Sequence, residues 1–291
     1  MQAIIFYLSY PFILLVAYMP FPLFYAFSDL FYFILYVLIG YRTKVVRENL
    51  KKSFPGKTTD ELKHIERNYY RYLCDLMLET LRTISMTEKD YAKRVVMHNT
   101  ELMQKLYDER GSVVLVMGHY GNWEWTGPAI AINTPFQLNV IYRPLSNPFF
   151  ERMIYKMRTK FGTKITPVNN VLRELVSSKH IKTAIGIIAD QTPLPETAYW
   201  TTFLNQDTPV YEGTEKIAKK FNYPVVFINV TRKARGYYEI KPEILSLEPG
   251  KSADGEITEL HTRKLERQIQ QTPELWLWSH RRWKHKRKMS V

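Results

Sequence analysis

The first forty residues limit the fold most, because they contain two long apolar runs that a chain must either bury or place in a membrane. The runs are Ala3 to Met19 and Leu23 to Gly40; neither holds a Lys or Arg, and Asp29 is their only acidic residue. Each run is close to the ~20 residues with which a helix crosses a bilayer. The prolines of Pro20-Phe21-Pro22 break or kink a helix between them. One tilted span, a tight helical hairpin and a re-entrant anchor all fit this pattern.

We expect residues 1–40 to be a membrane anchor, with the core helix of a soluble protein as the alternative. They show no basic start and no clear small-residue cleavage site, so they do not resemble a removable signal peptide. Residues 41–291 are then expected to form one further domain. The single cysteine, Cys74, excludes an internal disulfide and a cysteine-only metal site, and it fits a reducing compartment.

The charge of the chain predicts an anionic partner, since its formal net charge is +13. Five Lys and Arg residues lie between Tyr41 and Lys52, directly after the apolar runs. Basic residues beside an anchor favour the cytoplasmic side of a membrane for that flank and for the domain behind it. A second basic run spans His280 to Lys288, and it is either a solvated tail or a contact for anionic headgroups.

Strand-like and helix-like segments alternate through the rest of the chain, which predicts an α/β fold with a central sheet flanked by helices. Short β-branched runs predict strands at Ser112–Met117, Phe136–Tyr142, Thr183–Ala189, Pro224–Val230 and Arg235–Lys241. Helical periodicity and capping residues predict helices at Thr58–Arg82, Glu101–Asp108, Trp123–Ala131, Pro148–Phe161, Asn169–Ser178, Thr214–Phe221 and Thr258–Gln271.

The segment Gly118-His119-Tyr120-Gly121-Asn122-Trp123-Glu124 follows the first of these strands. Its glycines allow a sharp turn, and Asn122 is a suitable N-cap for the next helix. A neutral imidazole is the usual general base near neutral pH, and a nearby carboxylate orients it and stabilises its charged form. The H-x4-E spacing therefore predicts a catalytic pair of His119 and Glu124, although a loop histidine beside a solvated glutamate has the same spacing.

Two more strand ends carry candidate site residues. Arg143 follows one strand and could bind phosphate or polarise a carbonyl, with a salt bridge to Asp190 or Glu124 as the alternative. Asp190 and Gln191 follow another and could orient Arg143 or bind a substrate hydroxyl, with turn or capping roles as the alternative. H-x4-E lacks the second histidine of the H-E-x-x-H zinc motif, so we expect no metal.

Together these segments resemble the late acyltransferases of lipid A biosynthesis, a family in the lysophospholipid acyltransferase-like superfamily. The resemblance is carried by the apolar N-terminus, Val45-Val46-Arg47-Glu48-Asn49-Leu50 with Phe54-Pro55, the Gly118–Glu124 segment, Tyr142-Arg143-Pro144 with Asn147-Pro148, Ala189-Asp190-Gln191, and Trp276-Leu277-Trp278-Ser279-His280-Arg281-Arg282-Trp283-Lys284. These blocks run in the family's order over nearly the whole chain. One departure is Tyr211, which stands where the related glycerolipid enzymes have a proline before Glu-Gly-Thr.

The resemblance implies a mixed central sheet and a reaction that needs no cofactor. His119 would deprotonate a hydroxyl of the acceptor, Glu124 would orient His119, and the alkoxide would attack an acyl thioester. Arg143 would bind phosphate or stabilise charge, and Asp190 and Gln191 would contact substrate. The implied partners are acyl carrier protein, with coenzyme A as the other possible donor, an anionic glycolipid acceptor and the bacterial inner membrane, with the catalytic domain on its cytoplasmic face.

Two other functions fit parts of the same sequence. The same chemistry could acylate another lyso-lipid, such as an amino-acid lipid. A non-catalytic, membrane-tethered nucleic-acid-binding protein would explain the positive charge, and it requires salt-sensitive retention of nucleic acid. We expect no nucleic-acid partner, because no recognisable nucleic-acid motif is present.

Overall fold

The computed structural model describes residues 1–287, so Lys288 of the predicted basic run lies outside the described residues. The fold is built around a seven-stranded sheet in the order β1-β9-β8-β2-β5-β3-β4. Its strands are β1 (Val95–Met97), β2 (Val113–Met117), β3 (Gln137–Tyr142), β4 (Lys164–Pro167), β5 (Thr183–Ile188), β8 (Val225–Ala234) and β9 (Tyr237–Ser246). Neighbouring strands pair in parallel except β8 with β9. The expected α/β class and mixed sheet are therefore confirmed.

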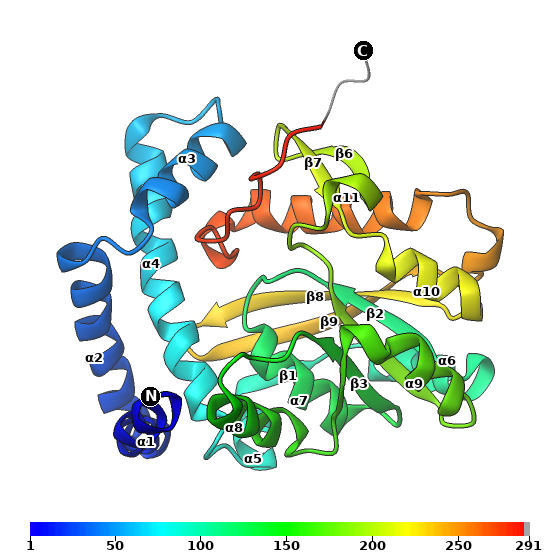
Figure 1. The fold of residues 1–291 in the computed structure, drawn as a ribbon, viewed down its shortest axis with the longest axis horizontal. Coiled ribbons are helices and arrows are strands. Elements are labelled where there is room, and N and C mark those ends of the chain that lie inside the picture. Colours follow the sequence, from blue (N-terminus) through cyan, green and yellow to red (C-terminus); the bar gives the residue numbers. More distant parts are fainter. Residues whose placement is uncertain (288–291) are drawn as a thin grey trace.

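Helices cover both faces of the sheet (Figure 1). Along β2, Val114 and Val116 face the core that also contains α9 (Val171–Ser177), α10 (Gly213–Phe221) and α11 (Glu256–Gln271). Val113 and Leu115 face the second core, with α6 (Thr100–Arg110) and α7 (Trp123–Asn133). A strand whose two faces are both buried has to be apolar throughout, which explains the continuous run of aliphatic residues in β2.

The helix α4 (Thr59–Arg82) connects the N-terminal helices to the sheet domain. It begins at a capping box in which Thr58 and Glu61 satisfy each other's backbone N–H groups. α1 (Gln2–Tyr18) and α2 (Phe21–Tyr32) both pack against it, and α3 (Thr43–Ser53) follows them in the chain. Figure 1 shows α1 nearly end-on while α2 lies in the plane of the picture, so the two helices cross.

Among the described residues, one helix is long and apolar enough to cross a membrane, namely Phe21–Leu38. It consists of α2 and the π-helical turn η1 (Phe33–Leu38). Only 17% of this stretch is buried inside the protein, so it is not the core helix of a soluble domain. The break at Pro20 separates it from α1, a shorter apolar helix with Pro11 inside.

The structure adds elements that the sequence pattern did not predict. The helix α5 (Glu88–Arg94) precedes β1, and β6 (Tyr199–Phe203) and β7 (Gln206–Val210) form a separate hairpin. By contrast, α8 (Pro148–Thr159) is the helix expected over Pro148–Phe161. The hairpin's turn residues Leu204 and Asn205 both have positive φ. Glycine usually occupies the positive-φ positions of such a hairpin turn, so the presence of Leu204 explains why the sequence did not predict this hairpin. The strand expected from Arg235 begins at Tyr237, because Gly236 (φ 74°) forms the preceding turn.

Candidate active site

The ends of β2 and β5 bring His119 and Asp190 together. The two strands are parallel neighbours, and the Ala189 N–H donates to the Met117 carbonyl (3.0 Å) just before both chains leave the sheet. His119 Nδ1 lies 2.6 Å from Asp190 Oδ1, and the His119 backbone N–H donates to Asp190 Oδ2 at 2.8 Å. The carboxylate thus holds both the ring and the backbone of His119.

This geometry selects the tautomer of the histidine. With its proton on Nδ1, facing Asp190, the neutral ring keeps the Nε2 lone pair available. The His119 side chain is 16% exposed, and its ring meets Trp123 edge-on at 5.0 Å between centroids. The Gln191 amide nitrogen lies 3.4 Å from Nε2, which marks this nitrogen as the one that faces the solvent side of the site. The arrangement suits a general base.

Asp190 is a buried carboxylate that stays ionised. Burial by itself raises the pKa of this carboxyl, but the charge of His119 and the hydrogen bonds from His119 and Trp276 outweigh burial and lower the pKa to about 2. A fixed negative charge beside Nδ1 stabilises the imidazolium that forms when Nε2 accepts a proton.

Glu124 has a different partner from the one expected. Its two carboxylate oxygens accept from Arg158 on α8, at 2.6 Å from Nη2 and 3.1 Å from Nε. The predicted orienting contact to His119 is therefore corrected: Asp190 holds the imidazole. The reason is the direction of α7, which begins at the Asn122 cap and carries Glu124 toward α8, while β5 is the direct neighbour of β2.

Arg143 and Gln191 are both exposed at the same end of the sheet. Arg143 follows β3, and its loop is held by Glu151, which accepts from the Tyr142 hydroxyl and the Leu145 N–H, each at 2.8 Å. The β3 strand pairs with β5, so Arg143 leaves the sheet beside the Asp190 strand. The structure thus joins His119 with Asp190 and Gln191, and leaves Glu124 on a separate ion pair.

The turn that carries His119 is anchored by α4. The Tyr72 hydroxyl donates to the Gly121 carbonyl, and the Asn122 side chain donates to the buried Glu79 (2.8 Å). Gly121 has φ 61°, and a side chain there would lie 2.6 Å from Val230 Cγ1. Both the positive φ and the close approach require glycine at this position.

The C-terminal segment contributes site residues to which sequence reasoning assigned no role. The Trp276 indole N–H donates to Asp190 Oδ2 (2.8 Å), and the Leu277 N–H donates to the His119 carbonyl (3.2 Å). Asn49 on α3 donates to the carbonyls of Trp278 and His280, which fixes the segment. The only indication in the sequence that this segment contributes to the site was the aromatic Trp276–Lys284 block, which is part of the family resemblance. In the described part of the chain, no group of three or more His, Cys, Asp or Glu side chains is arranged to hold a metal ion.

Comparison with known proteins identifies the family. The chain is 22% identical over 247 residues to a lipid A biosynthesis palmitoleoyltransferase of Escherichia coli (strain K12), a match that covers 84% of this chain and 79% of that protein. A lipid A biosynthesis acyltransferase of Shigella flexneri matches with the same identity and coverage. The family model for the bacterial lipid A biosynthesis acyltransferase matches residues 1–285. Since this match covers nearly the whole chain, the protein belongs to the bacterial lipid A biosynthesis acyltransferase family.

Proposed function

We propose that this acyltransferase moves a fatty acyl chain from an acyl thioester to a free hydroxyl of a lipid A precursor. The observation that carries the proposal is the His119–Asp190 contact at 2.6 Å in a chain of this family, with the unprotonated Nε2 of His119 beside the exposed Gln191 amide. An ionised Asp190 and a neutral imidazole are the combination that proton removal from a hydroxyl requires.

The reaction follows from this pair. His119 Nε2 takes the proton of the acceptor hydroxyl as its oxygen attacks the thioester carbonyl carbon. The tetrahedral intermediate then collapses with cleavage of the carbon–sulfur bond, and the leaving thiolate takes the proton from the imidazolium. Asp190 offsets the charge of the imidazolium while it exists. Hydrogen-bond donors aimed at the developing oxyanion lower the barrier, and Gln191 and Arg143 at the neighbouring strand ends are the candidates.

The acyl donor in this proposal is acyl carrier protein. The net charge of +13 favours an acidic carrier protein, and it equally favours an anionic glycolipid acceptor. Coenzyme A would supply the same thioester chemistry, so the two donors are compared directly in the assay below. Glu124 has an indirect role in the proposal. Its carboxylate holds Arg158 beside α7, and Arg158 contacts an anionic group of the substrate.

The proposed location is the cytoplasmic face of the bacterial inner membrane. The exposed apolar surface of Phe21–Leu38 supplies the attachment, and Arg42, Lys44 and Arg47 follow it on the chain. Basic residues in this position favour the cytoplasmic side and contact with anionic headgroups.

The test is mass spectrometry of lipid A and of total lipids from cells with the active protein, without it, and with His119→Ala. We expect lipid A to lose one acyl chain without the protein and with His119→Ala, since loss of a general base costs about 10²–10⁴-fold in rate. The exposed His64→Ala is the matched control and keeps full activity. Unchanged lipid A with accumulation of another lyso-lipid, such as an amino-acid lipid, would overturn the acceptor assignment. Purified protein with acyl carrier protein or coenzyme A thioesters identifies the donor.

A further inference from the structure

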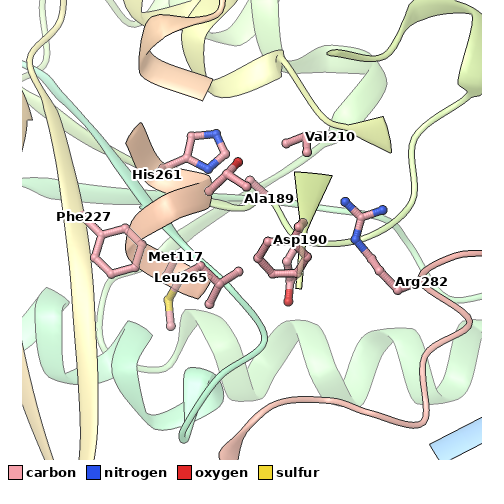
Figure 2. Close-up of a pocket in the computed structure, with 10 residues that line it drawn as sticks. Met117, Ala189, Asp190, Val210, Phe227, His261, Leu265 and Arg282 are labelled. Atoms are coloured by element: carbon pink, nitrogen blue, oxygen red, sulfur yellow. The ribbon is translucent and has the colours of Figure 1, made fainter. Parts of the chain in front are cut away.

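A small cavity borders Asp190. Asp190, His261 of α11 and Arg282 of the C-terminal segment line it together with apolar side chains, among them Phe227 and Leu265 (Figure 2). Figure 2 shows His261 and Arg282 on opposite sides of the cavity. It has about 10 Å³ of room for the centre of a water molecule, which is space for one water.

Arg282 is an unusual residue for this position, because it is only 2% exposed. Its Nη2 donates to the Pro209 carbonyl at 2.7 Å, while its Nε and Nη1 have no hydrogen-bond partner among residues 1–287. Burial lowers the pKa of Arg282 to about 10, and the charge of Asp190 acts in the opposite direction. A buried guanidinium that lacks a countercharge is strongly destabilising. Asp190 is the carboxylate that lines the same cavity, and its negative charge favours the charged form of Arg282.

Trp276 approaches the same carboxylate directly. Its indole N–H donates to Asp190 Oδ2 at 2.8 Å, and the Trp276 side chain is buried. Oδ2 already accepts the His119 backbone N–H, so the indole completes the hydrogen bonding of this oxygen and leaves Oδ1 for the His119 ring. Two hydrogen bonds to the same oxygen restrict rotation of the carboxylate about the bond that joins it to the rest of the Asp190 side chain.

We propose that Trp276 and Arg282 are positioning residues that keep Asp190 ionised and oriented toward His119, Trp276 by its hydrogen bond and Arg282 by its charge across the water-sized cavity. His261 Nε2 also has no partner among the described residues, and with the two N–H groups of Arg282 it gives a water in the cavity three polar neighbours. The proposal rests on the proposed role of His119 as general base. It assigns a function to the C-terminal block Trp276–Trp283.

The proposal predicts a change in pH dependence, since the donor and the cation both oppose protonation of the His119–Asp190 pair. Trp276→Phe and Arg282→Met remove them and shift the acid limb of kcat/KM to higher pH by about half a unit or more. The other titratable or charged groups around this pair are His261 of α11, with Glu215 of α10 behind it, and His280 and Lys284 of the C-terminal segment. These groups are unchanged in both variants.

The experiment uses the full chain in detergent and compares Trp276→Phe with Trp278→Phe. Trp278 is also buried and also loses an indole hydrogen bond, but its partner is the Pro273 carbonyl. We expect Trp276→Phe to lower kcat about tenfold and move the acid limb, while Trp278→Phe leaves the limb in place. Arg282→Lys keeps the charge, so we expect the acid limb of its kcat/KM profile to lie at the wild-type pH. In Arg282→Met, the acid limb is expected to lie at higher pH. A limb shift in Trp276→Phe no larger than that in Trp278→Phe overturns the proposal.

A second readout needs no substrate. The proton that His119 Nδ1 shares with Asp190 gives a low-field NMR signal, which is assigned by its loss in Asp190→Asn. We expect this signal to move or broaden in Trp276→Phe and Arg282→Met and to persist in Trp278→Phe; an unchanged signal in both variants contradicts the positioning role. If wild-type protein shows no acyl transfer but this pattern appears, the proposed function fails while the positioning role stands. Should Arg282→Met fail to fold, Arg282→Lys and Trp276→Phe still decide the question.

Discussion

At the scale of single residues, hydrogen-bond partners determine which carboxylate orients the imidazole of His119. Asp190 and Glu124 are both carboxylates near the same turn, but their surroundings separate their functions. Asp190 faces three N–H donors, from the ring and backbone of His119 and from Trp276. Glu124 faces the guanidinium of Arg158 with both oxygens. Spacing along the chain favoured Glu124 as the orienting acid, whereas the hydrogen bonds favour Asp190.

We therefore predict that Asp190→Asn lowers kcat by about 10²–10⁴-fold, because an amide stabilises the wrong imidazole tautomer and carries no charge. Glu124→Gln is expected to cost less, and the double variant Glu124→Gln with Arg158→Gln to cost little more than either single variant. Two residues that act as one ion pair are not additive. Steady-state kinetics of the four variants checks this. A severe loss in Glu124→Gln together with nearly full activity in Arg158→Gln would instead give Glu124 its own part in the reaction.

Among the elements, α4 connects the apolar helix α2 to the turn that carries His119. Glu79 of α4 accepts from Tyr25 of α2 and from Asn122 at the start of α7, each at 2.8 Å. One turn earlier, the buried Asp75 accepts from Ser28 of α2 (2.7 Å) and pairs with Arg235. The apolar helix α2 is thus part of the hydrogen-bonding network that supports the turn of His119.

We predict that deletion of residues 1–40 releases the protein from membranes and also destabilises the remaining domain. Ser28→Ala separates the two effects: it keeps the attachment but lowers stability by about 1–3 kcal/mol, since it removes a hydrogen bond to a buried carboxylate. Ser9→Ala is the matched control, because Ser9 donates only to its own helix, at Phe6. Membrane flotation and thermal unfolding measure the two properties. If the protein without residues 1–40 still floats with membranes, its basic and amphipathic surfaces are responsible for the attachment.

At the scale of the whole molecule, the buried His261 and the half-buried His280 both lie beside the site. Burial lowers the pKa of His261 and of His280 to about 4. In the unfolded chain these groups titrate near 6.5. A base whose folded pKa is depressed contributes stability that is fully present above its unfolded pKa and is lost as the pH falls toward the folded value. The folded protein is therefore expected to lose stability between about pH 6.5 and pH 4.

We predict that His261→Gln flattens this part of the stability profile. The fully buried His261 accounts for on the order of 3 kcal/mol of the loss over the interval. Thermal unfolding of the detergent-solubilised protein from pH 7.5 to 4 measures it, with His64→Gln as the exposed control. An identical slope in His261→Gln and wild type would show that His261 is already charged in the folded protein.

Long and strongly periodic segments were predictable from sequence, and short or irregular ones were not. The helix over Thr58–Arg82 and the strand over Ser112–Met117 match α4 and β2 closely, because local spacing and capping define both. The strands β1 and β4 have three and four residues, too few for an alternating pattern to show. The π-helical end of α2 has no local sequence signal either.

The sequence by itself determined the apolar N-terminal helices, the alternation of strands and helices, and the identity of His119 as the candidate base, since each depends on residues near one another in the chain. The tertiary structure decided which side chains surround that base. β5 pairs with β2, so Asp190 reaches His119 from 71 residues away, and the C-terminal segment adds Trp276 from still farther along the chain. Strand order and packing set these contacts, and neither is encoded in the spacing of a local motif.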